Sequence, residues 1–337
     1  MNAAIIGLGS QYGLGGKHAA VYDTRPEVDR IALCDTRREV AEKVAATLRK
    51  PTTLHTSIDD LFSAGRVDVV SILTPDHLHR THAEAACAAG VQILLTKPIA
   101  PTLPDARAIV ASARKAGVHL MIHHEMRFRS IYPRARELIA SGRLGDIAYI
   151  GITELYQYVR EKFANAPWYA TRESGRTMVT GSGVHQVDML RWLCGRPVRR
   201  VTALGNRVGD LPYWHNKTIV ALLEFEGIDG IGELTFSYEG MPGMARGGLT
   251  VIGSKGMISL EKFRDRISGQ EESLKPDHEE DSHQAGVHAF LDALRDGRPV
   301  PITGEDGFDS VATAHAIDVS CETGQTAKPE QLRESAT

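Results

Sequence analysis

The chain has 337 residues, 42% of them hydrophobic and 24% charged, with a formal net charge of -3 at pH 7. This length favours two domains, and the charge balance excludes a nucleic-acid-binding field and a polybasic membrane face. No apolar run is long enough to span a membrane, and the first one begins too early to follow a signal peptide. The 4 cysteines form no CxxC pair, which indicates free thiols and a cytoplasmic protein.

The first part of the chain alternates short apolar runs with helical patterns. The runs are typical of strands buried on both faces of a parallel sheet, and they cover residues 3–6, 30–34, 67–73, 91–95 and 118–122. Helical patterns lie between them over 37–49, 79–89 and 104–116, and the last two end at glycine, as helix C-termini prefer. Repeated units of this kind predict an α/β Rossmann domain with a doubly wound parallel sheet over residues 1–122.

Residues 123–337 follow a different pattern. After a helical pattern at 129–141, strands succeed one another from residue 146, and several alternate apolar with polar residues. Glycines at 227–230 and 253–256 indicate hairpin turns, a helical segment spans 183–194, and the polar stretch 268–282 predicts a mobile loop. Helices are expected at 285–295 and 308–323, and a late helix can pack back on the first domain. This pattern predicts an α+β domain with a large, open, mainly antiparallel sheet, whose exposed face favours a homodimer or homotetramer.

A glycine-rich loop opens the chain in MNAAIIGLGSQYGLGGKHAA. Gly7 and Gly9 lie between a strand and a helical stretch, which is the context of a dinucleotide-binding fingerprint. Gly7 permits the tight turn and Gly9 lets the backbone approach a pyrophosphate, which the helix N-terminus then stabilises. The third glycine is displaced: Tyr12 stands at its usual position, and Gly13 and Gly15 are both candidates. The glycines alone are weak evidence, since a flexible turn has the same composition.

The second predicted strand ends at Asp35, about where an acidic side chain meets the ribose diol of NAD. A helix-capping aspartate is the alternative. Thr36 follows as a further cofactor-binding candidate, and then come Arg37 and Arg38, of which an arginine can accept the 2′-phosphate of NADP. The acid favours NAD, and the arginines leave NADP open.

Two further strands end in polar residues, where open α/β sheets bind ligands. Thr74 and Pro75 follow one strand and His79 comes shortly after, so we assign all three to the cofactor site. The neighbouring histidines do not predict a metal site, because they do not share a helix face and no acid or cysteine completes a cluster. Lys97 follows the other strand in TKPIA, where a desolvated lysine can contact the cofactor and take part in proton transfer. A surface lysine is the alternative.

The segment GRTMVTGSGVHQVDMLRWLCG places a glycine-rich loop before a helix, with His185 in the first helical turn. Asp188 lies three residues later on the same helix face. The helix dipole opposes the charging of an imidazole at this end, so His185 is expected to stay neutral and able to accept a proton. The alternative is a core histidine satisfied by Asp188.

Taken in this order, AIIGLG, ALCD, TPDHLH, TKPIA, GSGVHQVDMLRWLCG and PITGEDGFDS resemble the Gfo/Idh/MocA family of NAD(P)-dependent oxidoreductases over nearly the whole chain. The resemblance implies a Rossmann domain, an open antiparallel domain, and hydride transfer between nicotinamide and a secondary alcohol or ketone of a sugar, inositol or related polyol. Lys97 matches the lysine of the family's EKP motif, and His185 matches the histidine of its DxGxH segment. The resemblance therefore implies that both are catalytic, with His185 taking the hydroxyl proton and Lys97 holding the oxygen.

The chain departs from the family pattern in three places. The glycine loop is expanded between Gly9 and Gly15, Thr96 replaces the glutamate of EKP, and Gly181 replaces the aspartate of DxGxH. The last change removes part of the family's catalytic set. It leaves open an NAD-recycling lyase or glycosidase, and a non-catalytic NAD-bound sensor.

Further residues are expected to contact the small-molecule substrate, namely His124, Arg127, Tyr156, Trp168 and Asp188. For Arg127 the alternative is a salt bridge to Glu125 or to a neighbouring helix. Trp168 and Tyr169 can stack on a sugar ring, and the alternative is that they cover a core.

Overall fold

The computed structural model describes residues 1–9, 13–157, 163, 166–241, 244, 247–276 and 278–335. The chain divides into two compact units. The first comprises Met1–Ala100, Pro104–Glu125 and Glu280–Phe308, and the second comprises Pro101–Leu103, Met126–Glu279 and Asp309–Thr337.

The first unit is built on a parallel sheet with the strand order β3-β2-β1-β4-β5-β6. Its strands are β1 (Asn2–Ile6), β2 (Arg30–Cys34), β3 (Thr52–His55), β4 (Val69–Ile72), β5 (Gln92–Thr96) and β6 (Leu120–His123). β4 is buried along its whole length, as expected for a strand covered by helices on both faces. The order reverses between β1 and β4, which confirms the predicted doubly wound sheet.

Strand β3 is absent from the sequence prediction. Its sequence TTLH is short and largely polar, and it pairs only with β2 among the described strands, at the edge of the sheet. An edge strand lacks a neighbour on one side and needs no continuous apolar run. The apolar signal that revealed the inner strands is therefore missing here.

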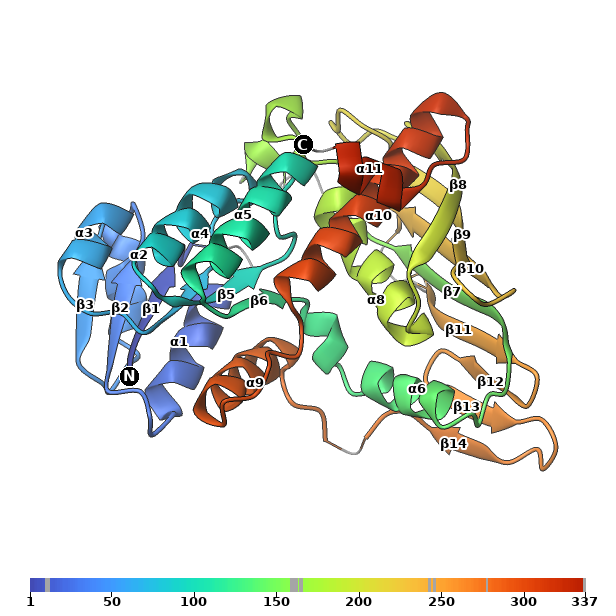
Figure 1. Ribbon diagram of the computed structural model, residues 1–337, viewed down its shortest axis with the longest axis horizontal. Coiled ribbons are helices and arrows are strands. Elements are labelled where there is room, and N and C mark those ends of the chain that lie inside the picture. The colour runs from blue at the N-terminus through green and yellow to red at the C-terminus, as the bar shows by residue number, and fades with distance from the viewer. Residues whose placement is uncertain are drawn as a thin grey trace. The chain divides into compact units, whose positions relative to one another are not determined.

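Helices cover this sheet, as Figure 1 shows. They are α1 (Leu14–Thr24), α2 (Arg38–Ala45), α3 (Ile58–Ser63), η1 (Asp76–Leu78), α4 (His79–Ala88), α5 (Leu103–Ala116) and α9 (Ser282–Arg295). The late helix α9 belongs to the first unit and lies beside α1 (Figure 1). Its N-terminus is capped by Asp281, whose carboxylate accepts hydrogen bonds from the backbone N–H groups of His283 and Gln284.

The second unit contains a mainly antiparallel sheet with the order β14-β13-β12-β11-β7-β10-β9-β8, in which only the β7–β10 pairing of the described strands is parallel. The strands are β7 (Ile147–Leu155), β8 (Val198–Asn206), β9 (Thr218–Phe225), β10 (Ile231–Ser237), β11 (Gly247–Gly253), β12 (Gly256–Ser259), β13 (Lys262–Asp265) and β14 (Glu271–Ser273). Both predicted hairpin turns are confirmed, between β9 and β10 and between β11 and β12. The predicted loop at 268–282 is partly wrong, because it contains β14.

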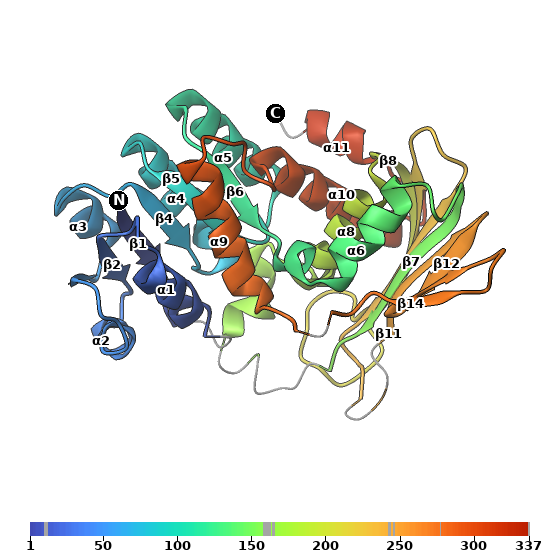
Figure 2. The same cartoon turned by 90° about the horizontal axis from the view of Figure 1, so that it is seen from below.

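The remaining helical elements are η2 (Glu125–Phe128), α6 (Ile131–Ala140), η3 (Pro167–Tyr169), η4 (Arg172–Ser174), η5 (Val179–Gly183), α8 (Val184–Cys194), α10 (Gly304–Thr323) and α11 (Pro329–Ser335). In Figure 2, α6 and α8 lie on one side of the second sheet. Residues of both helices share a buried apolar cluster with the strands, including Leu138, Leu190, Ile152 and Leu234. Burial against this layer is what holds the helices to the sheet.

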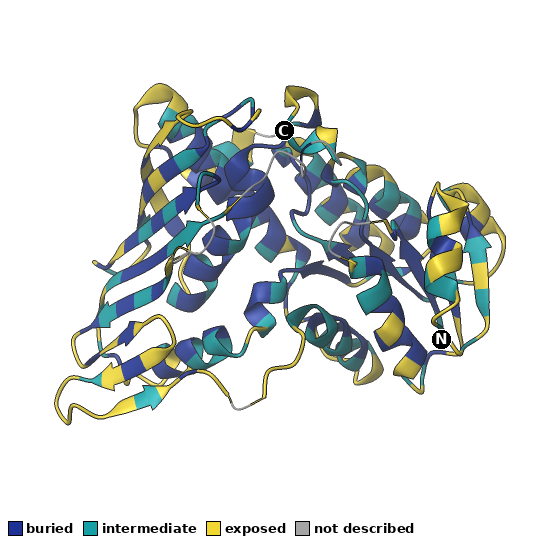
Figure 3. Ribbon diagram, turned by 180° about the vertical axis from the view of Figure 1, so that it is seen from behind, coloured by how far each residue is buried: buried dark blue, intermediate teal, exposed yellow. Residues whose placement is uncertain are grey.

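The opposite face of the second sheet carries exposed apolar side chains. Leu222 of β9 is 50% exposed and Ile231 of β10 is 52% exposed, and Leu204, Val220 and Met257 are exposed as well. Buried and exposed residues alternate along these strands, as the striped colouring in Figure 3 shows. This alternation is the period of two expected when one face of a sheet is covered by its own helices.

Two of the predictions made from composition concern membranes and thiols. Among the described helices, none combines the length and the apolar character needed to cross a bilayer. All cysteines of the chain are free thiols, with Cys34 and Cys87 buried and Cys194 and Cys321 half-buried. The prediction of free thiols is therefore confirmed.

A cluster of three histidines lies inside the first unit. His18 of α1 is fully buried, and its ring centroid lies 5.0 Å from that of His123, which lies 5.9 Å from that of His283. His18 Nδ1 is 2.9 Å from Ser71 Oγ, and no hydrogen-bond partner among the described residues reaches Nε2 of His18 or of His123. Burial lowers the pKa of His18 to about 3 and that of His283 to about 4, and it lowers the pKa of His123 well below its usual value.

From the lowered pKa values of these three histidines we predict that acid destabilises the protein. Because their pKa values are lower in the folded chain than in the unfolded chain, the unfolded chain binds more protons below about pH 6.5. The free energy of unfolding should therefore fall between pH 7 and pH 5, by about 2 kcal/mol for each such group. Urea titrations at both pH values measure this loss, which should be smaller in His18→Gln than in the wild-type protein. The exposed His278→Gln serves as the control, and an equal loss in all three proteins would contradict the prediction.

Candidate functional site

The glycine loop brings the end of β1 against the end of β4 and the start of α1. Gly7 has a φ of +87°, and a Cβ at this position would stand 2.8 Å from Thr74 Cγ2 and 2.9 Å from the Thr74 backbone nitrogen. A Cβ on Gly15 would stand 2.8 Å from the Cα atom of Leu8. Gly15 therefore makes the close helix–strand approach that the third glycine of the fingerprint provides.

Gly13 has a different role in the same loop. It is the N-cap of α1 with a φ of 65°, and it has no side chain with which to cap the helix. A helix that begins in this way presents its first N–H groups and its positive dipole end to an anion. Residues 10–12, Tyr12 among them, lie outside the described residues. The loop on either side of them has the close approaches that a dinucleotide needs.

Asp35 organises this loop from the end of β2. Its Oδ2 atom accepts hydrogen bonds from the backbone N–H groups of Leu8 (2.8 Å) and Gly9 (3.1 Å), and its Oδ1 atom accepts one from the N–H of Arg37 (3.0 Å). The Arg37 side chain lies over Gly9, where a Cβ would meet its Nη2 atom at 1.8 Å. The carboxylate thus holds the glycine loop and stands beside a guanidinium, 3.7 Å from Arg37 Nε to Asp35 Oδ1. Thr36 lies between them in the chain and is exposed.

Lys97 follows β5, and a buried histidine supports the peptide on its C-terminal side. The ring nitrogens of His79 lie 2.8 Å from the carbonyl oxygen of Pro98 and 3.0 Å from that of Thr74. His79 is fully buried, and burial lowers its pKa. It therefore lies between the segment after β4, where Thr74 and Pro75 lie, and the segment after β5, and its neutral ring can donate a hydrogen bond to one of the two carbonyl oxygens. This position favours a supporting role for His79 over direct contact with a cofactor.

His185 lies in the first turn of α8, directly after the π-helical turn η5. Its side chain is half-buried, whereas most residues around it in the helix are buried. Such widened turns inside helices occur frequently at functional sites. His185 thus combines partial exposure with a position directly after a widened helical turn. Because that turn continues into α8, His185 does not lie at a free helix N-terminus, and the dipole argument made from the sequence does not apply to it.

Asp188, one turn after His185, forms a buried ion pair with Arg127 of η2. The Nε and Nη2 atoms of Arg127 donate to the two carboxylate oxygens at 2.7 and 2.6 Å, and Ser310 Oγ donates a further bond at 3.0 Å. Asp188 is 0% exposed and Arg127 is 6% exposed. The salt bridge to a neighbouring helix, one of the alternatives for Arg127, is therefore present. In this arrangement both side chains support α8. Because they bond to each other, a positioning role is favoured over contact with substrate.

Trp168 and Tyr169 of η3 lie against a residue that the sequence did not single out. The Arg176 guanidinium carbon is 4.2 Å from the Tyr169 ring centroid and 5.6 Å from that of Trp168. Arg176 is 2% exposed, and its Nη2 atom donates to Ser182 Oγ at 3.2 Å. An arginine in a polar loop resembles a surface residue. Gly181, five residues later, is the one sequence feature here that is compatible with the close approach of a bulky group.

The two remaining substrate candidates, His124 and Tyr156, lie at the ends of different strands. His124 is buried after β6, while Tyr156 is half-buried after β7 with its ring centroid 6.1 Å from that of Phe236. Tyr158 and Arg160, which the alternation predicts on the same strand face as Tyr156, lie outside the described residues. The positions of His124 and Tyr156 do not indicate which ligand either residue would contact.

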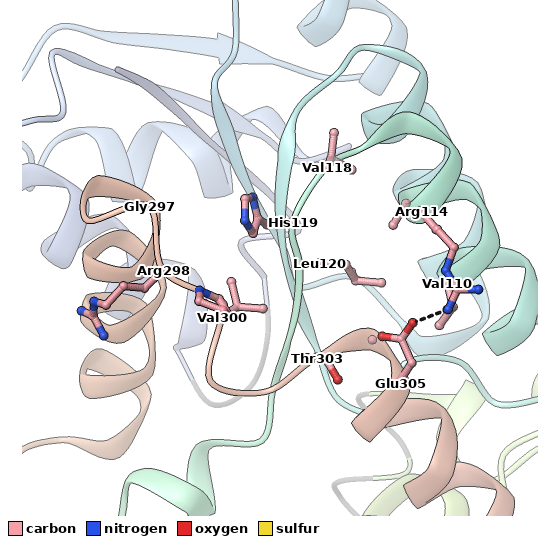
Figure 4. A pocket seen from close by; sticks show the side chains of 13 residues that line it. Val110, Arg114, Val118, His119, Leu120, Gly297, Arg298, Val300, Thr303 and Glu305 are labelled. Carbon is pink, nitrogen blue, oxygen red and sulfur yellow. Dashed lines mark hydrogen bonds and ion pairs between the residues drawn. The ribbon is translucent and has the colours of Figure 1, made fainter.

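A cavity of about 440 Å³ in the first unit lies at the other end of the parallel strands (Figure 4). It is lined by the start of β6, the end of α5 and residues 297–305. The two arginines that line it form ion pairs. Arg114 pairs with Glu305 at 2.8 Å, and Arg298 pairs with Asp296 at 2.9 Å. Its location, away from the carboxyl ends of β1, β4 and β5, separates it from the candidate cofactor site.

Comparison with known proteins agrees with this geometry. Residues 1–124 match the model of an oxidoreductase family with an NAD-binding Rossmann fold, and residues 132–259 match the GFO/IDH/MocA C-terminal domain. The chain is 29% identical to the 1,5-anhydro-D-fructose reductase of Ensifer adhaerens over 82% of this chain and 84% of that protein. It is 27% identical to inositol 2-dehydrogenase 2 of Saccharopolyspora erythraea, over 98% and 96%.

A solved structure has the same fold. It is an oxidoreductase from Agrobacterium radiobacter in complex with NAD+, L-tartaric acid and magnesium, with a TM-score of 0.85 at 21% identity over 98% of this chain and 99% of that chain. The family predicted from the sequence motifs is confirmed by the matches to both domain models. The chain belongs to the GFO/IDH/MocA family of oxidoreductases, whose amino-terminal domain is an NAD-binding Rossmann fold.

Proposed function

We propose that this protein transfers hydride between nicotinamide and a secondary alcohol or ketone of a sugar, inositol or related polyol. Support comes first from the relatives, which are named as reductases and dehydrogenases of such compounds. The observation that carries the proposal is the glycine loop, in which Gly7 and Gly15 leave room for the close backbone approaches of a dinucleotide site.

The residues that would hold the cofactor are the ones assembled around this loop. Gly9 and the start of α1 after Gly13 would approach the pyrophosphate, and Asp35 with Arg37 would meet the adenosine ribose. Thr74 and Pro75 line the neighbouring strand end. When bound, the nicotinamide exchanges hydride with the carbinol carbon of the substrate.

The protein's own part in the reaction concerns the substrate oxygen. We infer that His185, half-buried in the first turn of α8, takes the hydroxyl proton during oxidation. The Lys97 ammonium donates a hydrogen bond to the same oxygen and stabilises the negative charge that develops there. The buried ion pair of Asp188 and Arg127 would hold α8 in place, and His79 would hold the Lys97 loop.

Three features of the proposal go beyond the family itself, namely the oligomeric state, the cellular location and the choice between NAD and NADP. The open face of the second sheet favours a homodimer or homotetramer, which stays a prediction, as does the cytoplasmic location. The choice between NAD and NADP depends on the pair formed by Asp35 and Arg37, since the carboxylate favours the free diol and the guanidinium favours a 2′-phosphate.

Removing either proposed catalytic side chain should abolish most of the turnover. With a panel of polyols and NAD or NADP, Lys97→Ala and His185→Ala should each lower kcat at least about 100-fold, the usual contribution of general acid–base groups. NADH absorbance measures the rate, and calorimetry should show that NAD still binds. The exposed Lys115→Ala and His278→Ala are matched controls. Near-wild-type rates in Lys97→Ala or His185→Ala would remove that residue from the mechanism.

The same assay separates the alternative functions. Product without net NADH would indicate an NAD-recycling lyase or glycosidase. Binding of NAD without turnover of any substrate would indicate a sensor. NADH formation with at least one polyol supports the proposed oxidoreductase.

A methyl group at the third glycine should disturb cofactor binding. Gly15→Ala places a Cβ 2.8 Å from the Leu8 backbone, whereas Gly16→Ala places one where nothing lies within 4 Å. Gly15→Ala should weaken NAD binding at least about tenfold and destabilise the protein by about 1–3 kcal/mol, since backbone must move to admit the methyl group. Gly16→Ala should bind NAD normally. Calorimetric titration with NAD compares the two, and equal affinities would show that the close approach does not shape the site.

A further inference from the structure

Thr177 lies just before the widened turn η5 and bonds to its first residues. Its Oγ1 atom accepts a hydrogen bond from the backbone N–H of Thr180 at 3.0 Å, and its carbonyl oxygen accepts one from the N–H of Gly181 at 3.0 Å. In return, Thr180 Oγ1 accepts a bond from the N–H of Thr177 at 2.9 Å. The first N–H groups of a helical segment have no partner inside that segment. The start of η5, and with it the helix that carries His185, is therefore held by Thr177.

The Thr177 hydroxyl is in turn held by a carboxyl group of α10, within the same unit. Thr177 Oγ1 donates to Asp318 Oδ2 at 2.6 Å. The side chains along this path are buried, since Thr180 is 0% exposed, Asp318 is 4% exposed and Thr177 is 7% exposed. A hydroxyl has one proton, so donation to Asp318 leaves its lone pairs for the N–H of Thr180. Asp318 thus fixes the direction in which the Thr177 hydroxyl points.

The other oxygen of Asp318 lies beside a buried histidine. Asp318 Oδ1 is 3.9 Å from Nδ1 of His215, and neither atom has a hydrogen-bond partner among the described residues. On the far side of the ring, His215 Nε2 is 3.3 Å from Oε1 of Glu322, so this nitrogen carries the proton of the neutral imidazole. Nδ1 and Oδ1 are then two acceptors with no donor between them, which is costly in a buried site. One proton on either atom removes this mismatch.

Burial favours the proton on the carboxyl group. It raises the pKa of Asp318 to about 8, against the hydrogen bond from Thr177 and with a contribution from the charge of Glu322. Burial also lowers the pKa of His215, and the bond to Glu322 opposes that change. Asp318 is therefore a neutral acid at pH 7, and it titrates within the pH range in which enzymes are assayed.

Other charged or titratable groups lie on the three elements that meet at this pair. They are Arg176 from the segment of Thr177, Arg207 from the loop between β8 and β9, and Glu322, Cys321 and His315 from α10. The charge of Arg207 lowers the pKa of His215. Asp318 is the member of this set with a hydrogen bond to the Thr177 hydroxyl, so its proton is the one to which η5 responds.

We propose that Asp318 is a positioning residue, which together with His215 holds Thr177 and thereby the turn that places His185. The proposal rests on the function proposed above, since it concerns the helix of the proposed proton acceptor. While Asp318 is protonated, its proton satisfies Oδ1 and Nδ1, and the pair is uncharged. Loss of the proton leaves a carboxylate charge in a buried site, and the segment has to move to let water reach it. Activity therefore falls as the pH rises through the titration of Asp318.

Asp318→Asn tests this role because an amide copies the protonated acid. Its oxygen can accept from Thr177, its NH2 group can donate towards His215, and it does not titrate. With the best substrate of the polyol panel, kcat/KM of the wild-type protein should fall at least about tenfold between pH 7.5 and pH 9.5, as the protonated fraction falls. In Asp318→Asn the fall should stay below about threefold. Asp229→Asn, an exposed aspartate in the turn between β9 and β10, is the matched control and should follow the wild-type profile.

Hydrogen exchange follows the turn without using activity. Mass spectrometry measures exchange of the backbone N–H groups in residues 178–184, and proteins are compared at the same pH so that the chemical rate of exchange cancels. At pH 9 these groups should exchange at least about tenfold faster in the wild-type protein than in Asp318→Asn, and at pH 6.5 the two proteins should be equal. Residues 69–72 of β4 in the first unit serve as the internal control.

Substitution of Thr177 tests the link between the carboxyl group and the turn. Thr177→Val keeps the shape but removes the hydroxyl, so residues 178–184 should exchange at least about tenfold faster at both pH values, and kcat should fall. Thr177→Ser keeps the hydroxyl and should restore both. These two variants also decide the question if thermal melting shows that Asp318→Asn does not fold.

Three results would overturn the proposal and leave the proposed function intact. They are an equal alkaline fall of kcat/KM in the wild-type protein and Asp318→Asn, equal exchange of residues 178–184 in these two proteins at pH 9, and wild-type exchange in Thr177→Val. If no polyol yields NADH, the proposed oxidoreductase function fails. Faster exchange of the wild-type turn at pH 9 then still supports the role of Asp318 in holding it.

Discussion

The buried ion pair between Arg127 and Asp188 is the interaction on which the arrangement around α8 depends. Both side chains are withdrawn from water, and their bidentate bonds of 2.7 and 2.6 Å, with a third bond from Ser310, compensate the lost hydration. Removal of one partner of such a pair typically costs about 3–5 kcal/mol, because the other charge is left buried alone. The pair ties η2, which follows β6, to the helix whose first turn carries His185. The pair therefore helps to hold in place the helix that carries His185.

In the first unit, the functional segments are held by close contacts of the backbone at glycines. Gly7 packs on Thr74 and Gly15 packs on Leu8. The Asp35 carboxylate accepts hydrogen bonds from the N–H groups of Leu8 and Gly9. The segment after β1 can approach the segment after β4 because Gly7 lacks a Cβ, and α1 can approach Leu8 because Gly15 lacks one. In both units, buried polar bonds hold the functional segments, and the functional groups themselves remain at the ends of elements.

The departure from the family pattern at Gly181 acquires a physical meaning from its surroundings. The guanidinium of Arg176 fills the volume above this glycine, and the donors of Ser182 and Tyr238 adjoin it. The character of the turn before His185 is therefore cationic and rich in donors. This places the difference between this chain and the family pattern next to the residue proposed to move the substrate proton.

The sequence alone determined the fold class of both units and the approximate places of the inner strands, because burial imposes periods that a single sequence displays. Its motifs also indicated the family. It also suggested Lys97 and His185 as the catalytic candidates, which stay a prediction, because their motifs are local. Only the tertiary structure decided that Gly15 makes the close helix–strand contact, that Arg127 pairs with Asp188, and that Arg176 covers Gly181. The polar edge strand β3 also escaped detection, since its sequence lacks an apolar run. Arg127 and Asp188 are 61 positions apart, and no local pattern specifies which distant charge a buried side chain meets.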